Sequence, residues 1–186
     1  MASIINTSLL PNKSWEWTIT SKMGDMLQKA EAKYGERDKT YTILGIELSS
    51  VGNPYIWYLG DRKQIIIRIN EFCLNDMDYA VFQVSQEIIH CLCPTGGSNA
   101  TYLEEGLATH FGNEYYRSCG YVKWHVNDPK YIEALNLVEQ LFRIDAEIIK
   151  KVRNIEPIIS LVTKNQLIDV NKNIPECLAD KLIKLY

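Results

Sequence analysis

Apolar residues recur at helical spacing near the start of the chain, between Trp15 and Tyr34. The positions on this stripe are Ile19, Met23, Met26, Leu27 and Ala30. Such spacing is typical of an amphipathic helix with one face toward a core. Ser14 can cap its first turn, and Gly35 can end it because glycine readily adopts the conformation that closes a helix. The pattern therefore predicts one helix over residues 15–34.

Strand-forming residues replace this helical pattern after residue 40. The sequence predicts three strands, at Tyr41–Leu48, Asn53–Leu59 and Gln64–Asn70, separated by Gly-Asn-Pro and Gly-Asp turn signals. Gly60-Asp61-Arg62-Lys63 suits a hairpin turn, so we expect Pro54–Leu59 and Gln64–Asn70 to pair antiparallel. These strands together predict a small, mostly antiparallel sheet.

The spacing of apolar residues becomes helical again at Asn75. This residue can cap a helix that ends before Pro94. Its predicted buried stripe comprises Ala80, Val81, Val84, Ile88 and Cys91. The remaining predicted helices span 101–116, 128–153, 157–162 and 174–186. Most of the second half of the chain is therefore expected to be helical.

One helix, three strands and then several helices is an order typical of an α+β fold. A chain of 186 residues is expected to form a single domain, residues 1–186. Residues 1–100 would form a strand-rich part that includes the helix beginning at Asn75, and residues 101–186 a helical part. This length allows a full hydrophobic core without disulfides or metals.

Charge and cysteine content narrow the class of partner. The net charge of -3 argues against a nucleic-acid binder. The most basic stretch, Lys150-Lys151-x-Arg153, closes a predicted helix, where cations interact favourably with the helix dipole. No apolar run reaches the roughly 18 residues of a membrane span, and residues 1–11 lack a secretory signal pattern. Five cysteines without a CxxC pair predict reduced thiols and a cytoplasmic location.

The helix beginning at Asn75 carries the most informative motif, Gln86-Glu87-Ile88-Ile89-His90. Side chains four residues apart lie on one helical face, so those of Gln86 and His90 can point to the same place. In zinc peptidases two histidines hold these positions and bind the metal, while the intervening glutamate activates a zinc-bound water. A third ligand, a glutamate, arrives in one large class from the next helix, where this chain has Glu104-Glu105-Gly106.

From Tyr41 to Tyr116 the chain resembles a small gluzincin-type, or minigluzincin, metallopeptidase with a zincin-like fold. The resemblance implies a strand-rich layer with an antiparallel edge strand, which the segment 64–70 matches. It also implies Glu87 as general base, with His90 and Glu105 as metal ligands. The expected fold is therefore α+β and zincin-like, with a small sheet packed on the active-site helix and a helical C-terminal part.

Gln86 departs from this family pattern. Its neutral amide oxygen stands where zinc prefers imidazole nitrogen or thiolate. We therefore expect no metal or weakly bound zinc on Gln86, His90 and Glu105. The preferred hypothesis is a pseudopeptidase that binds a peptide or protein along the edge strand, residues 64–70, without cutting it. The alternatives are an active zinc metallopeptidase (a hydrolase) with an atypical third ligand, and a helical interaction domain unrelated to zincins.

Other residues near the motif are weaker candidates. The Cys93 thiolate would suit zinc, but it sits at the helix end on the far side of His90 from Gln86. His125, Tyr115 and Tyr116 could stabilise an oxyanion, with ordinary packing or surface roles as the alternative. His110 is expected to point away from the face of Glu105. His90 and Glu87 themselves have plain alternatives, as a half-buried histidine and a solvated helix charge.

Overall fold

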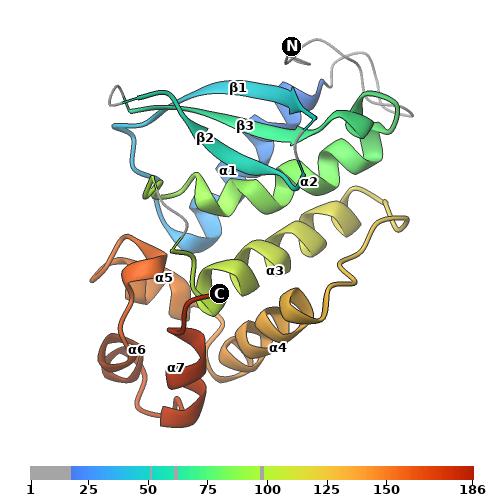
Figure 1. Cartoon of the computed structure of the whole chain (residues 1–186). Helices are drawn as coiled ribbons and strands as arrows, with labels where there is room; N and C mark the ends of the chain where they lie inside the picture. Colours follow the sequence, from blue (N-terminus) through green and yellow to red (C-terminus); the bar gives the residue numbers. More distant parts are fainter. Residues whose placement is uncertain (1–17, 51, 61–62, 97–98) are drawn as a thin grey trace.

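The computed structural model describes residues 18–50, 52–60, 63–96 and 99–186. A three-stranded sheet forms one layer, with helices α1 and α2 against one of its faces (Figure 1). Helices α3 and α4 pack beyond α2, and α5, α6 and α7 gather at one end of this helical part. The molecule is therefore α+β, as predicted.

Helix α1 spans Ile19–Tyr34 and buries the predicted stripe except Leu27, which is half-buried. Its cap is Thr18, whose side chain accepts a hydrogen bond from the backbone of Ser21 and completes a capping box. Gly35 follows the helix with a φ of 96°, which confirms the predicted stop. The predicted cap Ser14 and the first predicted helical residues, from Trp15, lie outside the described residues.

The sheet contains β1 (Thr42–Ser49), β2 (Tyr55–Tyr58) and β3 (Gln64–Asn70) in the order β1-β3-β2. The predicted hairpin is confirmed, because β2 pairs antiparallel with β3. However, β1 pairs parallel with β3 over a longer register. The sheet is therefore mixed, and the prediction of a mostly antiparallel sheet was wrong.

The prediction that Gln64–Asn70 is an edge strand was also wrong. This strand is β3, which lies in the centre with partners on both sides. Its inward side chains Ile65, Ile67 and Ile69 are fully buried, whereas no residue of β2 is. The hydrophobic effect places the strand with the most apolar inner face in the middle. Among the described residues, the antiparallel edge of the sheet therefore belongs to β2, whose side chains are half-buried.

A short 3-10 turn, Glu71–Leu74, leads into α2 (Met77–His90), and α3 spans Tyr102–Ser118. Both helices were predicted, and the predicted stripe of α2 is fully buried. Asp76, rather than Asn75, caps α2 by accepting a hydrogen bond from the Tyr79 amide. Thr101 caps α3 in the same way. These caps fix where the two motif-bearing helices begin.

The predicted helix over 128–153 is two helices, α4 (Pro129–Ile144) and α5 (Ile148–Arg153). Asp145 separates them because its backbone is extended and its carboxylate accepts a hydrogen bond from the Glu147 amide. Two short helices follow, α6 (Lys164–Val170), which was not predicted, and α7 (Glu176–Leu182). Only the 3-10 turn Ile159–Leu161 forms within the predicted helix 157–162.

The buried apolar residues of the sheet and of the helical part form one continuous cluster. Within the described ranges, no helix is both long and apolar enough to span a bilayer.

Candidate functional site

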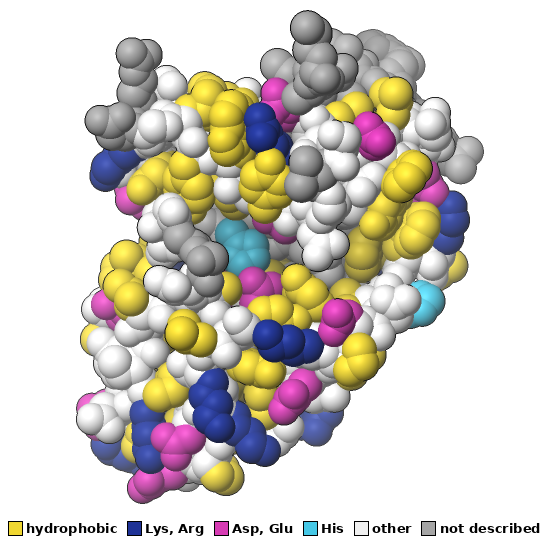
Figure 2. Space-filling model, viewed as in Figure 1, with side chains coloured by type: hydrophobic (Ala, Val, Ile, Leu, Met, Phe, Trp, Pro, Cys, Tyr) yellow, Lys and Arg dark blue, Asp and Glu magenta, His cyan; other side chains and the backbone are white. Residues whose placement is uncertain are grey.

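A cleft separates the sheet from the helical part, and Figure 2 shows it as a hollow with histidine and acidic side chains at its floor. It consists of two adjoining cavities of about 500 and 460 Å³. Five residues line both cavities: Pro54, Glu87, His90, Glu105 and Tyr131. The predicted motif residues therefore lie where the two halves of the cleft meet.

Helix α2 supplies Gln86, Glu87 and His90 to this floor. Gln86 packs against Gly112 of α3, where an added Cβ would lie 2.7 Å from the Gln86 Cγ. This glycine lets α2 and α3 approach closely, because any larger residue would collide with the glutamine side chain. The face of α2 that carries Gln86 and His90, as the helical spacing predicted, therefore lies toward α3.

Helix α3 supplies Glu105 to the cleft. The next residue, Gly106, is needed for close packing between α3 and α4. A Cβ at Gly106 would overlap the backbone carbonyl of Ala134 in α4. The absence of a side chain therefore allows α4 to lie against the first turns of α3. This close contact brings Tyr131 of α4 to the cleft beside Glu105.

The two ring nitrogens of His90 face different carboxylates. Nδ1 lies 2.8 Å from Oε1 of Glu104, within hydrogen-bond distance, and Nε2 lies 3.7 Å from Oε1 of Glu105. Burial by itself lowers the pKa of His90, but the hydrogen bond to Glu104 and the nearby carboxylate charges outweigh it and raise the pKa. The predicted convergence of His90 and Glu105 is present, and Glu104 holds the other side of the ring.

Glu87 is 7% exposed, and its carboxylate accepts no hydrogen bond from another described residue. Burial, together with the charges of Glu105 and Glu104, raises its pKa to about 7, although the charge of His90 opposes this. Burial and repulsion from Glu104 also raise the pKa of Glu105. Glu87 is therefore not a solvated helix charge but a buried carboxyl group.

We expect Glu87→Gln to flatten the pH dependence of stability. The folded pKa of about 7 lies above the ordinary value of 4.5, so the folded state holds the proton longer. The protonated group therefore contributes fully to the free energy of unfolding below pH 4.5. This contribution, about 3 kcal/mol, is lost as the pH rises through 7. Urea unfolding at pH 5 and pH 8 should show a smaller loss for Glu87→Gln than for the parent, because His90 and Glu105, whose pKa values are also raised, still titrate in the variant. Glu133→Gln, at an exposed position on α4, is the matched control, and an equal slope in all three proteins would contradict the expectation.

Tyr131 and Glu104 are the site residues that sequence reasoning missed. Burial and the charges of Glu105 and Glu87 raise the pKa of the Tyr131 hydroxyl to about 12. It therefore stays protonated at neutral pH and can donate a hydrogen bond into the cleft. Glu104 had a signal in the doubled glutamate of the Glu-Glu-Gly motif, whereas Tyr131 had none.

Most of the weaker candidate residues lie away from the cleft. His125 is exposed and lines the larger cavity. Cys93 borders neither cavity, and its sulfur instead accepts a hydrogen bond from Arg153. Tyr115 donates to Asp25 of α1, away from the cleft. The structure therefore brings only His125 of this group to the site. The other two, His110 and Tyr116, pack against Phe142 and Phe82 respectively.

The donor set at the floor is one imidazole short of a catalytic zinc site. His90 offers Nε2, Glu105 a carboxylate and Gln86 a neutral amide oxygen. No group of three or more His, Cys, Asp or Glu side chains suited to holding a metal ion occurs among the residues that the structure describes. With an amide oxygen at position 86, the donor set thus differs by one ligand from the three protein ligands of a catalytic zinc site.

The chain matches no protein-family model, and neither the curated proteins nor the solved structures contain a match. The inferences that follow therefore rest on the geometry and chemistry of this chain.

Proposed function

We propose that this protein is a zincin-like pseudopeptidase whose cleft binds an extended peptide without cutting it. The observation that carries the proposal is the β2 edge, which pairs with no other strand of the described residues beyond β3 and lies beside a floor with Gln86 at the position of a zinc-binding histidine. Tyr55, Ile56 and Tyr58 of β2 line the smaller cavity together with His90 and Glu105. β2 therefore takes the role that the family resemblance gave to residues 64–70.

The pairing of β2 with β3 indicates which backbone groups of β2 do not bond to β3. The Leu59 amide donates to the Gln64 carbonyl at 3.0 Å. Hydrogen-bonded pairs alternate along an antiparallel ladder, so Trp57 and Tyr55 bond to β3, whereas Ile56 and Tyr58 turn their amide and carbonyl groups outward. An extended peptide can add to this edge as a further strand through main-chain hydrogen bonds, which need no metal.

We expect Ile56→Pro to lower peptide affinity about tenfold or more. Proline removes the outward amide of residue 56 but leaves the ladder bonds to β3, which an edge strand tolerates. Peptides selected from a displayed random library against the full chain in EDTA would be measured by calorimetry. Ile56→Ala keeps the amide and is the matched control. Equal affinity for the proline variant and the parent would contradict binding along β2.

A second candidate, an active metallopeptidase, is favoured by the His90–Glu104 hydrogen bond. A metal-bound histidine usually donates its other ring N–H to a carboxylate, which leaves the first nitrogen free for the metal. Elemental analysis of protein purified without chelator or His-tag separates the candidates. Clearly substoichiometric zinc supports the pseudopeptidase, whereas one tightly held zinc per chain supports the enzyme.

A further inference from the structure

The floor of the cleft carries more negative than positive charge. Three carboxylates, Glu87, Glu104 and Glu105, surround the single imidazole of His90. A carboxylate cluster alone does not make a site, but Glu87 adds an independent observation. It is 7% exposed, lines both cavities and accepts no hydrogen bond from another described residue. A buried, unpartnered acceptor aimed into a cavity indicates that a donor from a ligand completes it.

We propose that this floor binds a primary ammonium group of the peptide, either its N-terminus or a lysine side chain. The inference rests on the proposed peptide-binding function and names what the peptide must carry. It uses the groups that remain at the position where the family resemblance implies a metal.

An ammonium group matches the floor because it brings three N–H donors and needs three acceptors. Glu87, Glu105 and Gln86 all line the larger cavity. An amide oxygen is a poor zinc ligand but a good acceptor for an N–H donor. The replacement of histidine by Gln86 is thus unfavourable for a metal and favourable for an ammonium ion.

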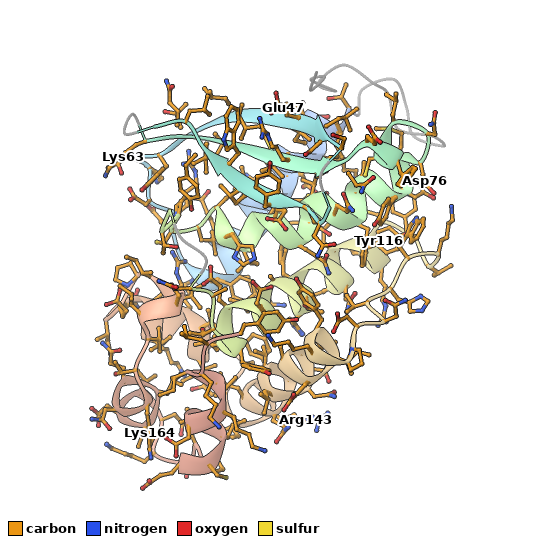
Figure 3. The ribbon with its side chains drawn as sticks, viewed as in Figure 1. Glu47, Lys63, Asp76, Tyr116, Arg143 and Lys164 are labelled. Carbon is orange, nitrogen blue, oxygen red and sulfur yellow. The ribbon has the colours of Figure 1, made fainter. Side chains whose placement is uncertain are left out.

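The neighbouring cations leave this position open. His90 Nε2 lies 3.7 Å from the Glu105 carboxylate, beyond hydrogen-bond distance. Lys123 borders the larger cavity but pairs with Asp76, which Figure 3 shows at the start of α2. The ammonium of Lys130 lies over the ring of Tyr186, 4.1 Å from its centroid. Charge-assisted hydrogen bonds to Glu87 and Glu105 are therefore left for the ligand.

Both sources of the ammonium group are compatible with the cleft. The cavities continue on either side of His90 and Glu105, so a peptide can end at the floor or run past it. The two sources share one chemistry, and the experiment separates them with matched peptides.

NMR titration of the ¹⁵N-labelled full chain in EDTA tests the proposal with three alanine-based peptide amides. The first has a free amino terminus, the second is N-acetylated, and the third is N-acetylated with one lysine. We expect the first or the third to bind about tenfold more tightly than the second, with shifts at the amides of Gln86, Glu87 and Glu105. Equal affinity for all three would overturn the proposal while leaving peptide binding intact. Binding by none would overturn both.

Neutral variants locate the effect. Glu105→Gln and Glu87→Gln should each abolish the difference between the ammonium-bearing and the acetylated peptides, because they keep the shape and remove the charge. Glu133→Gln, exposed and outside both cavities, should retain it. Circular dichroism of each variant checks the fold. The proposal requires that at least one of the two cleft variants stays folded and binds the ammonium-bearing and acetylated peptides equally. In a separate titration with zinc chloride and no chelator, saturation of the parent at micromolar zinc would overturn the proposal.

Discussion

Gln86→His is expected to give the protein a zinc-dependent rise in melting temperature that the parent lacks. Residue 86 lies one helical turn before His90 on the face that lines the larger cavity. A new imidazole there joins His90 Nε2 and the Glu105 carboxylate, which are 3.7 Å apart. Three such protein ligands and a water complete a tetrahedral zinc site. Zinc that binds only the folded state stabilises it by about 2.7 kcal/mol at a hundredfold excess over the dissociation constant.

Melting curves with and without zinc, for the parent, Gln86→His and the double variant Gln86→His/Glu105→Gln, give the test. The double variant retains two imidazoles four residues apart and should respond much less than the single one. A parent that already responds would mean that the chain completes a metal site with another ligand. A single variant that does not respond would remove the support for a zincin-like arrangement of α2 and α3.

The core of this site could be predicted because it depends on local spacing. Helical periodicity alone places Gln86 and His90 on one face. The family resemblance then implied Glu105 from the following helix, and the structure places its carboxylate near His90. Local turn chemistry likewise predicted the pairing of the second and third strands, which the sheet confirms.

The position of a strand within the sheet could not be predicted in this way. Alternation of apolar residues has the same period in a central and in an edge strand, so residues 64–70 gave no sign of having two partners. The outcome depends on which strand buries more apolar surface. Ile65, Ile67 and Ile69 are fully buried in β3, whereas the side chains of β2 are only half-buried.

The residues that support the motif depend on how the helices pack. Glu104 lies beside the predicted ligand Glu105 in sequence, but its contact with His90 requires the crossing geometry of α2 and α3. Tyr131 reaches the cleft because α4 lies close to α3 at Gly106. Neither arrangement follows from helical periodicity, which gives the buried face of a helix but not its neighbour.

Arg153 is a further residue whose role the sequence hid. It ends a basic stretch that we interpreted as a favourable interaction with the helix dipole, yet its side chain is 6% exposed. Nη1 donates to the carbonyls of Tyr34 and Gly35 at 2.7 and 2.8 Å, and Nη2 donates to the carbonyl of Glu36 at 2.9 Å. Nε donates to the carbonyl of Pro157 at 3.1 Å. The guanidinium thus joins the end of α1 to the segment after α5.

We therefore expect Arg153→Met to lower the free energy of unfolding by about 3–5 kcal/mol, measured by urea unfolding. Methionine fills much of the volume, but it leaves these carbonyls without their donor in a buried place. Arg153→Lys should recover only part of the loss, because an ammonium cannot reproduce the planar fork that reaches several carbonyls at once. Arg143→Met is the control, since its side chain is 75% exposed and points away from the helical part (Figure 3). This control substitution should cost less than about 0.5 kcal/mol.

Equal losses for Arg153→Met and Arg143→Met would mean that the hydrogen bonds of Arg153 make no net contribution to stability. A large loss restricted to Arg153 would show that a cation closes the end of α1 through its donors and not through its charge near a helix terminus.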